Sequence, residues 1–323
     1  MFDEQLAGFK GDEQCIRVVG HRGARGIMPE NTLLGFEWTI KMGVSALEFD
    51  VMITKDCVPV IVHNHHLNRD ITRTPQGDWL NAPEPRISDL TYEQLSQFDV
   101  GGLNIFTEYG QRFPEQIFMS GQKVPQLADL LRLINRPEFR HVRLMLEIKS
   151  DPHVPDHRDR QAQTVEAIVN VVRAHNVQAR TVLHSFDWEM LRMCQIEAPE
   201  MPTSFLSQLP EEEATAGGDP ASAFDAYVGT LPSVPQAVAD AGGYIWAPYF
   251  KDVTEHDVAH AKQLGLLISP WTVNDPHDMV RMIDLGVDAI VTDYPARLQR
   301  EMIKKQIRWQ RTEENTNAAL TSA

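Results

Sequence analysis

The sequence is poor in cysteine and contains no long apolar run. Its 323 residues include three cysteines, an odd number without a CxxC pair, so a disulfide framework is not expected. No stretch approaches the roughly 18 consecutive apolar residues of a membrane-spanning helix. The opening 15 residues are acidic and lack the apolar centre of a secretory signal. Together these absences predict a cytoplasmic protein with reduced thiols.

Positive charge is also scarce. The chain carries 30 Lys and Arg residues against 45 Asp and Glu residues, which gives a formal net charge of −15. Binding to nucleic acid or to an anionic membrane needs a basic surface, so we expect no nucleic-acid partner and no stable membrane association. An anionic substrate would therefore need positive charge supplied locally or by a metal ion. The composition leaves the oligomeric state open.

Short apolar segments alternate with amphipathic ones, which is typical of a parallel α/β fold. Strands are expected at Arg17–Gly20, Ala46–Val51, Val58–His63, Arg143–Lys149, Thr181–Phe186, Thr203–Ser207, Gly243–Ala247, Leu266–Val273 and Ala289–Thr292. The chain length suits one (β/α)8 TIM barrel, so one of these nine strands must lie outside it, and which one is left open. The link between Asp50 and His63 is too short for a crossover helix, so a hairpin or an irregular corner explains it better.

Helices are expected between most of the strands, and capping residues mark their ends. Thr32 can cap a helix that Gly43 ends, and Asp275 can begin another that Gly286 ends. We expect one barrel domain at residues 15–308 and a disordered tail at 309–323.

Two long segments interrupt the alternation. Residues 64–142 are expected to form a small inserted subdomain with helical stretches near Thr91–Phe98 and Pro125–Ile134. Residues 208–242 are rich in Glu, Ala, Gly and Pro and are expected to form a long flexible loop. Loops that follow barrel strands lie on the catalytic face, so both segments are expected to cover a site.

Paired carboxylates occur near the ends of two strands. Side chains two residues apart on a strand share a face, so Glu48 and Asp50 point the same way. The same parity puts Glu147 beside Lys149. Each pair alone is more often an exposed strand face, but three carboxylates at strand ends would suit a hard cation, Mg²⁺ or Ca²⁺. Lys149 beside them could hold an anion.

Two histidines and an arginine lie at the same strand ends. His21 and Arg22 follow the first strand, and His63 ends the third. Arginine can grip a phosphate with two hydrogen bonds, and histidine can move protons near neutral pH. A lone histidine at a strand end is more often structural. In a (β/α)8 barrel, however, the carboxyl ends of all strands meet on one face, so all these groups are expected in one bowl.

At this point the chain resembles the glycerophosphodiester phosphodiesterase family over roughly residues 17–300. The motifs that match, in the family's order, are His21-Arg22-Gly23, Pro29-Glu30-Asn31-Thr32, Glu48-Phe49-Asp50, Thr54-Lys55-Asp56 leading to Pro59-Val60-Ile61-Val62-His63, Glu147-Ile148-Lys149, Ser185-Phe186, Trp271-Thr272-Val273-Asn274 and Thr292-Asp293-Tyr294-Pro295. Each motif is weak alone, whereas the ordered set is specific.

The resemblance implies a phospholipase-C-like TIM barrel that hydrolyses glycerophosphodiesters to sn-glycerol 3-phosphate and an alcohol, with one divalent cation, Mg²⁺ or Ca²⁺. It also implies the roles of the matching residues. The metal ligands would be Glu48, Asp50 and Glu147, the general base His21, the general acid His63, and the phosphate-holding residues Arg22 and Lys149. Glu30 would orient Arg22, and Trp271 would face the glycerol, although a tryptophan at this place is as often simple core.

Three positions depart from the family pattern. Cys57 stands where the family usually has Gly, Asn64 follows His63 where it usually has Asp, and Gln126 stands where it often has Thr. The change at Asn64 bears on the orientation or basicity of His63. Two alternatives stay open: a phospholipase-like phosphodiesterase on intact or lyso-lipids, and a non-catalytic phosphate-ester binding barrel. The acidic charge and the acidic run at 211–213 speak against intact lipids.

Overall fold

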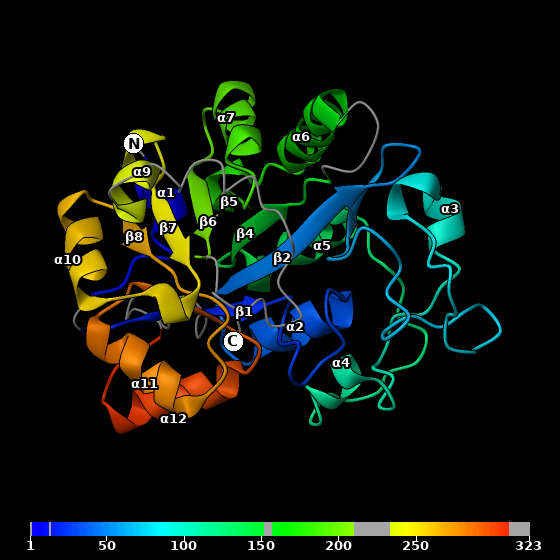
Figure 1. Ribbon diagram of the computed structural model, residues 1–323, viewed down its shortest axis with the longest axis horizontal. Helices are drawn as coiled ribbons and strands as arrows, with labels where there is room; N and C mark the ends of the chain where they lie inside the picture. Colours follow the sequence, from blue (N-terminus) through cyan, green and yellow to red (C-terminus); the bar gives the residue numbers. More distant parts are fainter. Residues whose placement is uncertain (1, 13, 152–156, 210–232, 310–323) are drawn as a thin grey trace.

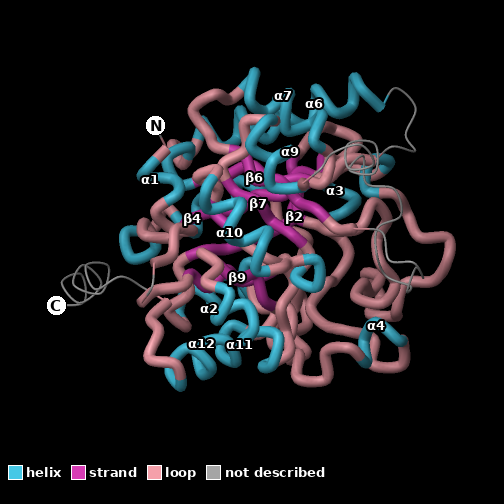
Figure 2. Tube along the Cα trace, turned by 60° about the vertical axis from the view of Figure 1, so that its left-hand side comes forward, coloured by secondary structure: helices cyan, strands magenta, loops and turns pink. Residues whose placement is uncertain are grey.

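The computed structural model describes residues 2–12, 14–151, 157–209 and 233–309. Strands lie at its centre and helices surround them (Figure 2). The strands are β1 (Arg17–His21), β2 (Ala46–Ile53), β3 (Pro59–Ile61), β4 (Arg143–Ile148), β5 (Thr181–Ser185), β6 (Thr203–Ser207), β7 (Ile245–Pro248), β8 (Leu267–Ile268) and β9 (Ala289–Thr292).

Eight of these strands form a nearly closed parallel barrel. Their order is β8-β7-β6-β5-β4-β2-β1-β9, while β3 pairs antiparallel with β2 and lies off this path. Backbone hydrogen bonds join the two ends of the sheet, from Asp288 N to Ile268 O (3.0 Å) and from Val291 N to Pro270 O (3.0 Å). The TIM barrel is therefore confirmed, and β3 is the ninth strand, which returns along β2 as a hairpin.

The longer helices are α2 (Leu33–Lys41), α5 (Leu127–Ile134), α6 (His157–Ala174), α7 (Trp188–Glu197), α9 (Val234–Asp240), α10 (Glu255–Gln263), α11 (Pro276–Leu285) and α12 (Pro295–Lys304). The predicted caps are present: the Thr32 side chain accepts a hydrogen bond from Gly35 N, and Gly286 ends α11 in the left-handed region at φ 70°. α1 (Asp3–Leu6), α3 (Tyr92–Leu95) and α4 (Glu108–Gln111) are single turns.

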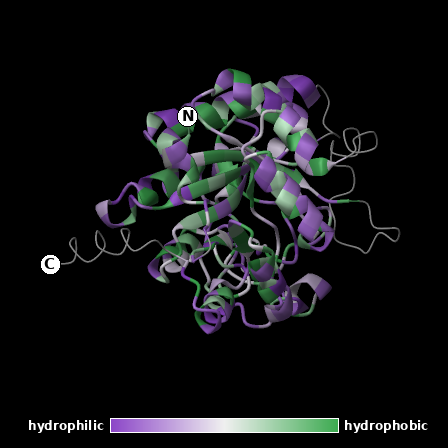
Figure 3. Ribbon diagram, turned by 90° about the vertical axis from the view of Figure 1, so that its left-hand side faces the viewer, coloured by the Kyte–Doolittle hydropathy of each residue, from purple (hydrophilic) through white to green (hydrophobic). Residues whose placement is uncertain are grey.

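Side chains alternate across each barrel strand. On β2, Leu47, Phe49 and Val51 pack outward against the helices, while Glu48 and Asp50 point inward. The lower interior is an apolar layer of Val19, Ala46, Met145, Val182, Ile245, Ala289 and Val291, into which the fully buried Phe9 of the N-terminal segment inserts. In Figure 3 hydrophobic colour lies on the strands and hydrophilic colour on much of the helices. The polar inward residues therefore lie above this buried apolar layer, which we call the apolar floor.

The segment between β3 and α5 lies at the end of the barrel toward which β2 runs, and it carries α3 and α4 (Figure 1). It is pinned to the β2–β3 turn by hydrogen bonds from Lys55 N to Leu90 O and from Tyr92 N to Asp56 Oδ1. A small apolar cluster joins the segment to β2 and β3, and it consists of Met52, Val60, Val62, Leu67, Ile87, Leu95, Val100 and Val124. α5, which we expected inside the insertion, packs instead with α2, α6 and the outward face of the barrel strands. The limits 64–142 of the insertion stay a prediction.

The predicted loop at 208–242 falls mostly on residues 210–232, which lie outside the described residues, as does the predicted tail apart from Trp309. At the end of that loop the structure has a helix, α9, because Ser233 caps it and Pro235 stands in its first turn. β8 is shorter than predicted because Pro270 removes a backbone donor from the strand's continuation. In the part of the chain that the structure describes, no helix is long and apolar enough to cross a membrane.

Candidate active site

Three carboxylates meet inside the barrel at the carboxyl end of β2 and β4. Asp50 is paired with Glu147 in the sheet, and Glu48 precedes Asp50 by one inward position. Oxygen atoms of Glu48, Asp50 and Glu147 all lie within 4.8 Å of one another, and all three residues are buried. Among the residues that the structure describes, Glu48 Oε1 is buried and finds no hydrogen-bond partner. The cluster is therefore an oxygen cradle of the size that a divalent ion fills, since opposite Ca²⁺ ligands lie up to about 5 Å apart.

Two cationic side chains border this cradle. Lys149 Nζ lies 2.5 Å from Glu147 Oε1 and 3.1 Å from Asp50 Oδ1. Arg22, with its backbone at φ 49° beyond β1, places Nε 3.2 Å from Asp50 Oδ2 and donates from Nη1 to Glu30 Oε1 at 2.9 Å. Arg22 and Lys149 therefore supply local positive charge, which an anionic substrate of this acidic protein would need.

The pKa values of the three carboxyls differ in direction. Burial and the neighbouring carboxylates raise the pKa of Glu48 well above its usual range. Burial also raises the pKa of Glu147 to about 7, although Lys149 opposes this. Burial acts on Asp50 too, but Lys149 and Arg22 outweigh it and hold its pKa well below the usual range. Two of the three groups therefore resist ionisation, as expected where carboxylates crowd together without a cation.

His21 is held by a carboxylate that comes from the far end of the chain. His21 Nδ1 lies 2.7 Å from Asp293 Oδ1, and Nε2 lies 3.7 Å from Glu48 Oε2. Arg25 donates to both oxygens of Asp293, at 2.9 Å and 3.0 Å, and holds its pKa below the usual range despite burial. An ionised carboxylate can only accept, so Nδ1 carries the proton and the Nε2 lone pair faces the cradle. Burial lowers the pKa of His21 to about 4.

His63 lies just beyond β3. Its Nδ1 is 3.0 Å from Asn64 Oδ1, so the amide oxygen accepts the hydrogen bond that an aspartate would otherwise accept. Burial, together with Arg22 and Lys149, lowers the pKa of His63 well below its usual value. The departure at Asn64 therefore keeps an acceptor for Nδ1 but leaves out a negative charge.

An aromatic group lies across the barrel mouth from the carboxylates. The rings of Phe186 and Tyr249 lie 5.2 Å and 5.5 Å from that of Trp271, and all three are partly exposed. Trp271 Nε1 donates to Ala247 O at 2.9 Å, which fixes the indole. On β5 below them, the buried His184 bonds through Nδ1 to Ser204 Oγ at 2.8 Å. Burial lowers the pKa of His184 to about 3.

The mouth therefore has two halves. The charged half consists of His21, Arg22, Glu48, Asp50, His63, Glu147, Lys149 and Asp293, and the neutral half of His184, Phe186, Ser204, Tyr249 and Trp271. All residues proposed from the sequence lie in or beside these halves, with Glu30 behind Arg22.

Sequence reasoning missed several members of the site. Asp293 lies in a matching motif but was expected to have no role, and Asn274 from another motif donates to the Asp293 carboxylate at 2.7 Å. Asn31, also from a motif, donates to Asp50 Oδ2 at 2.9 Å. Arg25 and His184 stand in no recognisable pattern, and only the fold brings them here.

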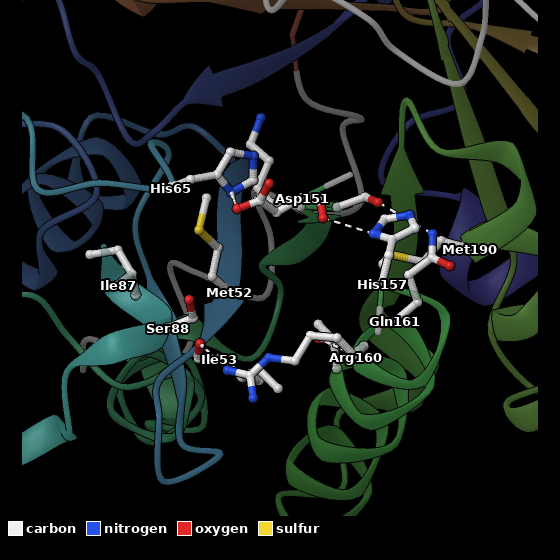
Figure 4. A pocket seen from close by; sticks show the side chains of 13 residues that line it. Met52, Ile53, His65, Ile87, Ser88, Asp151, His157, Arg160, Gln161 and Met190 are labelled. Carbon is white, nitrogen blue, oxygen red and sulfur yellow. Dashed lines mark hydrogen bonds and ion pairs between the residues drawn. The ribbon is translucent and has the colours of Figure 1, made fainter. Parts of the chain in front are cut away.

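A separate small cavity of about 40 Å³ lies behind Lys149, between β2 and α6 (Figure 4). Asp151 on its wall is paired with Arg86, and Arg160 donates to the carbonyls of Ile53 and Thr54. Such a volume holds a few water molecules at most, and its charged groups are already engaged. The cavity is therefore too small to bind a phosphate diester.

Comparison with known proteins agrees with this geometry. Residues 21–297 match the model of the glycerophosphoryl diester phosphodiesterase family. A glycerophosphodiester phosphodiesterase of Caldanaerobacter subterraneus is 26% identical over 285 residues, which cover 87% of this chain and 95% of the relative.

Solved structures give the same answer. A Silicibacter pomeroyi protein whose name places it in the same family is 48% identical, with a TM-score of 0.88 over 95% of this chain and 99% of its own. An Oleispira antarctica phosphodiesterase, solved in complex with sn-glycerol-3-phosphate, shares the fold at 22% identity, with a TM-score of 0.66 over 90% of this chain and 97% of its own. The chain therefore belongs to the glycerophosphoryl diester phosphodiesterase family.

Proposed function

We propose that this protein hydrolyses glycerophosphodiesters to sn-glycerol 3-phosphate and an alcohol. The observation that carries the proposal is the cradle of three buried carboxylates with Arg22 and Lys149 at its edge and His21 beside Glu48. Family membership supports the reaction class, and the product complex of the Oleispira relative supports a small phosphate ester as the ligand.

The donor set fits one divalent cation held by Glu48, Asp50 and Glu147. All three offer carboxylate oxygen, the donor that Mg²⁺ and Ca²⁺ prefer, and the raised pKa values of Glu48 and Glu147 mark a site short of positive charge. When bound, such an ion lowers the pKa of a coordinated hydroxyl and offsets charge on phosphate oxygens. Without it, burial and mutual repulsion raise the pKa values of Glu48 and Glu147, so Arg22 and Lys149 alone would have to offset the charge of a phosphate diester.

The two histidines would transfer the protons. His21, oriented by Asp293, takes the proton of the glycerol 2-hydroxyl at Nε2, and the resulting alkoxide attacks phosphorus. His63 gives a proton to the departing alcohol, and Arg22 and Lys149 hold the phosphoryl oxygens while their charge increases. Water then opens the cyclic phosphate as the histidines exchange roles. Trp271 offers a flat apolar wall to the glycerol carbons across the mouth.

The first experiment removes the metal. EDTA should abolish release of sn-glycerol 3-phosphate from glycerophosphoethanolamine or glycerophosphocholine, and Mg²⁺ or Ca²⁺ should restore it. A panel of headgroups crossed with a panel of metals would identify the preferred alcohol and ion. Full activity in chelator would contradict the metal assignment, and no turnover with any pair would favour the non-catalytic binding barrel.

One observation favours a second substrate class. The loop around α4 exposes large apolar side chains: Ile105, Phe106, Ile117, Phe118 and Met119. This is the apolar rim that a substrate with one acyl chain would use, as in a lysophospholipase D reaction. Lysophosphatidylcholine at a concentration below its micelle threshold, compared with glycerophosphocholine in the same assay, separates the two classes by their kcat/KM values.

A further inference from the structure

The inserted segment reaches the charged half of the site through one side chain, Tyr109 on α4. Its hydroxyl donates to Glu30 Oε2 at 2.5 Å and accepts from Arg25 Nη1 at 3.2 Å. The segment is fixed to the loop after β1 by two further bonds, from Gln116 Nε2 to Arg25 O (2.7 Å) and from Ile117 N to Ile27 O (2.9 Å). Tyr109 is therefore held in place from both sides.

This hydroxyl connects Arg22, the arginine proposed to bind phosphate, with the hydrogen-bonded pair of His21 and Asp293. On one side Glu30 receives Arg22 Nη1 on Oε1 at 2.9 Å. On the other side Arg25 grips Asp293, which holds His21. The connection runs in the order Arg22, Glu30, Tyr109, Arg25, Asp293 and His21, and every residue in it except the half-buried Tyr109 is buried.

The direction of each hydrogen bond follows from the groups. A guanidinium has donors only, so the tyrosine oxygen must accept from Arg25, and its single proton must go to Glu30. Burial and the nearby Glu30 carboxylate raise the pKa of Tyr109, which keeps the phenol neutral. Glu30 therefore shares its charge between two donors, Arg22 and Tyr109.

We propose that Tyr109 is a positioning residue that regulates how much of the Arg22 guanidinium is left for the substrate's phosphate. By donating to Glu30, it weakens the hold of that carboxylate on Arg22. Without the hydroxyl, Glu30 loses one of its two donors and attracts Arg22 more strongly. Arg22 then binds phosphate less well. Arg25 keeps both of its bonds to Asp293, so the orientation of His21 is preserved. This inference rests on the proposed function of the site.

The test replaces the hydroxyl alone, by Tyr109→Phe. The ring keeps its edge contact with Phe113, whose centroid is 5.6 Å away, so the fold should be retained. We expect KM for glycerophosphoethanolamine and Kd for sn-glycerol 3-phosphate to rise together by about tenfold, with kcat within about twofold, because one charge-assisted hydrogen bond is lost. Tyr92→Phe is the matched control: Tyr92 lies in the same insertion, and its hydroxyl contacts Val124 O at 3.5 Å. It should leave both constants unchanged.

A double-mutant cycle identifies the route. If Tyr109 acts through Glu30, the Tyr109→Phe change should have little further effect on Kd in a Glu30→Gln background. Unchanged KM and Kd in Tyr109→Phe, an equal change in Tyr92→Phe, or full additivity in the cycle would each overturn the inference. Wild-type turnover is measured alongside: if it is absent, the proposed function fails, whereas normal wild-type turnover with an unaffected Tyr109→Phe contradicts the inference alone.

Discussion

The charged and neutral halves of the barrel mouth share one backbone geometry but differ in what their inward side chains carry. Glu147 and His184 are register partners on adjacent strands, so they occupy equivalent positions on either side of the boundary between the halves. Glu147 accepts a hydrogen bond from Lys149, whereas His184 bonds to the neutral Ser204, and Lys149 and Asp50 act on it only through their charge. The barrel strands thus supply equivalent inward positions. The residue types at these positions make one half of the mouth charged and the other half neutral and aromatic.

The two buried histidines make the contrast measurable. Burial lowers the pKa of His21 to about 4 and that of His184 to about 3. The Asp293 carboxylate acts to raise the pKa of His21 through its charge, whereas Ser204 acts to raise that of His184 only through a hydrogen bond. Both histidines are therefore neutral at pH 7, and the difference is that Asp293 fixes the tautomer of His21 and stabilises its imidazolium when it takes up a proton.

The largest effect is expected on kcat, when each of these two histidines is replaced in turn. His21→Ala should lower kcat by about 10²–10⁴, because the general base is lost. His184→Asn, in the neutral half, should keep most of the wild-type kcat. Steady-state turnover of glycerophosphoethanolamine measures both variants. Comparable losses in the two would remove the distinction between the halves.

The second prediction concerns stability and its pH dependence. The folded-state pKa of His184 is about 3 and its unfolded value about 6.5, so only the unfolded chain takes up this proton as the pH falls. Wild-type protein without metal should therefore lose about 2 kcal/mol more unfolding free energy than His184→Asn between pH 7 and pH 5. Urea unfolding of both proteins at the two pH values measures the difference. Parallel losses would contradict a neutral, buried His184.

The smallest effect is expected from a substitution that adds one negative charge to the charged half. Asn64→Asp places a carboxylate where an amide oxygen now lies 3.0 Å from His63 Nδ1. It should raise the pKa of His63 by about one unit, since the imidazolium gains an opposite charge. His63 acts as an acid while protonated, so the alkaline limb of the kcat profile should move to higher pH. A pH–rate profile that stays in place would show that this departure from the family pattern does not matter.

Much of the site could be predicted because strand geometry has a period of two. The parity of Glu48, Asp50, Glu147 and Lys149 follows from sequence spacing, and the structure has all four on the inward face. The (β/α)8 topology then brings separate strand ends together. The capping residues at Thr32 and Gly286 likewise follow from local chemistry.

What the sequence could not show depends on distant contacts. His21 and Asp293 are 272 positions apart, and neither residue type alone indicates the pairing. Arg25 and Tyr109 stand in no motif, since their roles arise from a loop and an insertion that meet only in the folded chain. We expected α5 inside the insertion because its residues lie between 64 and 142 in the sequence. In the structure, its leucines pack with the barrel helices.

The apolar floor formed around Phe9 has a consequence for the order of events in catalysis. Among the described residues, the layer below the carboxylates is filled by side chains from six strands and the N-terminal segment. Under the proposed function, the diester and both products must therefore use the same opening. The alcohol departs first, because it is released when the cyclic phosphate forms, and the phosphate monoester leaves last because the charged half retains it. Accumulating sn-glycerol 3-phosphate would then compete directly with fresh substrate, so the turnover rate would respond to how quickly the product is consumed.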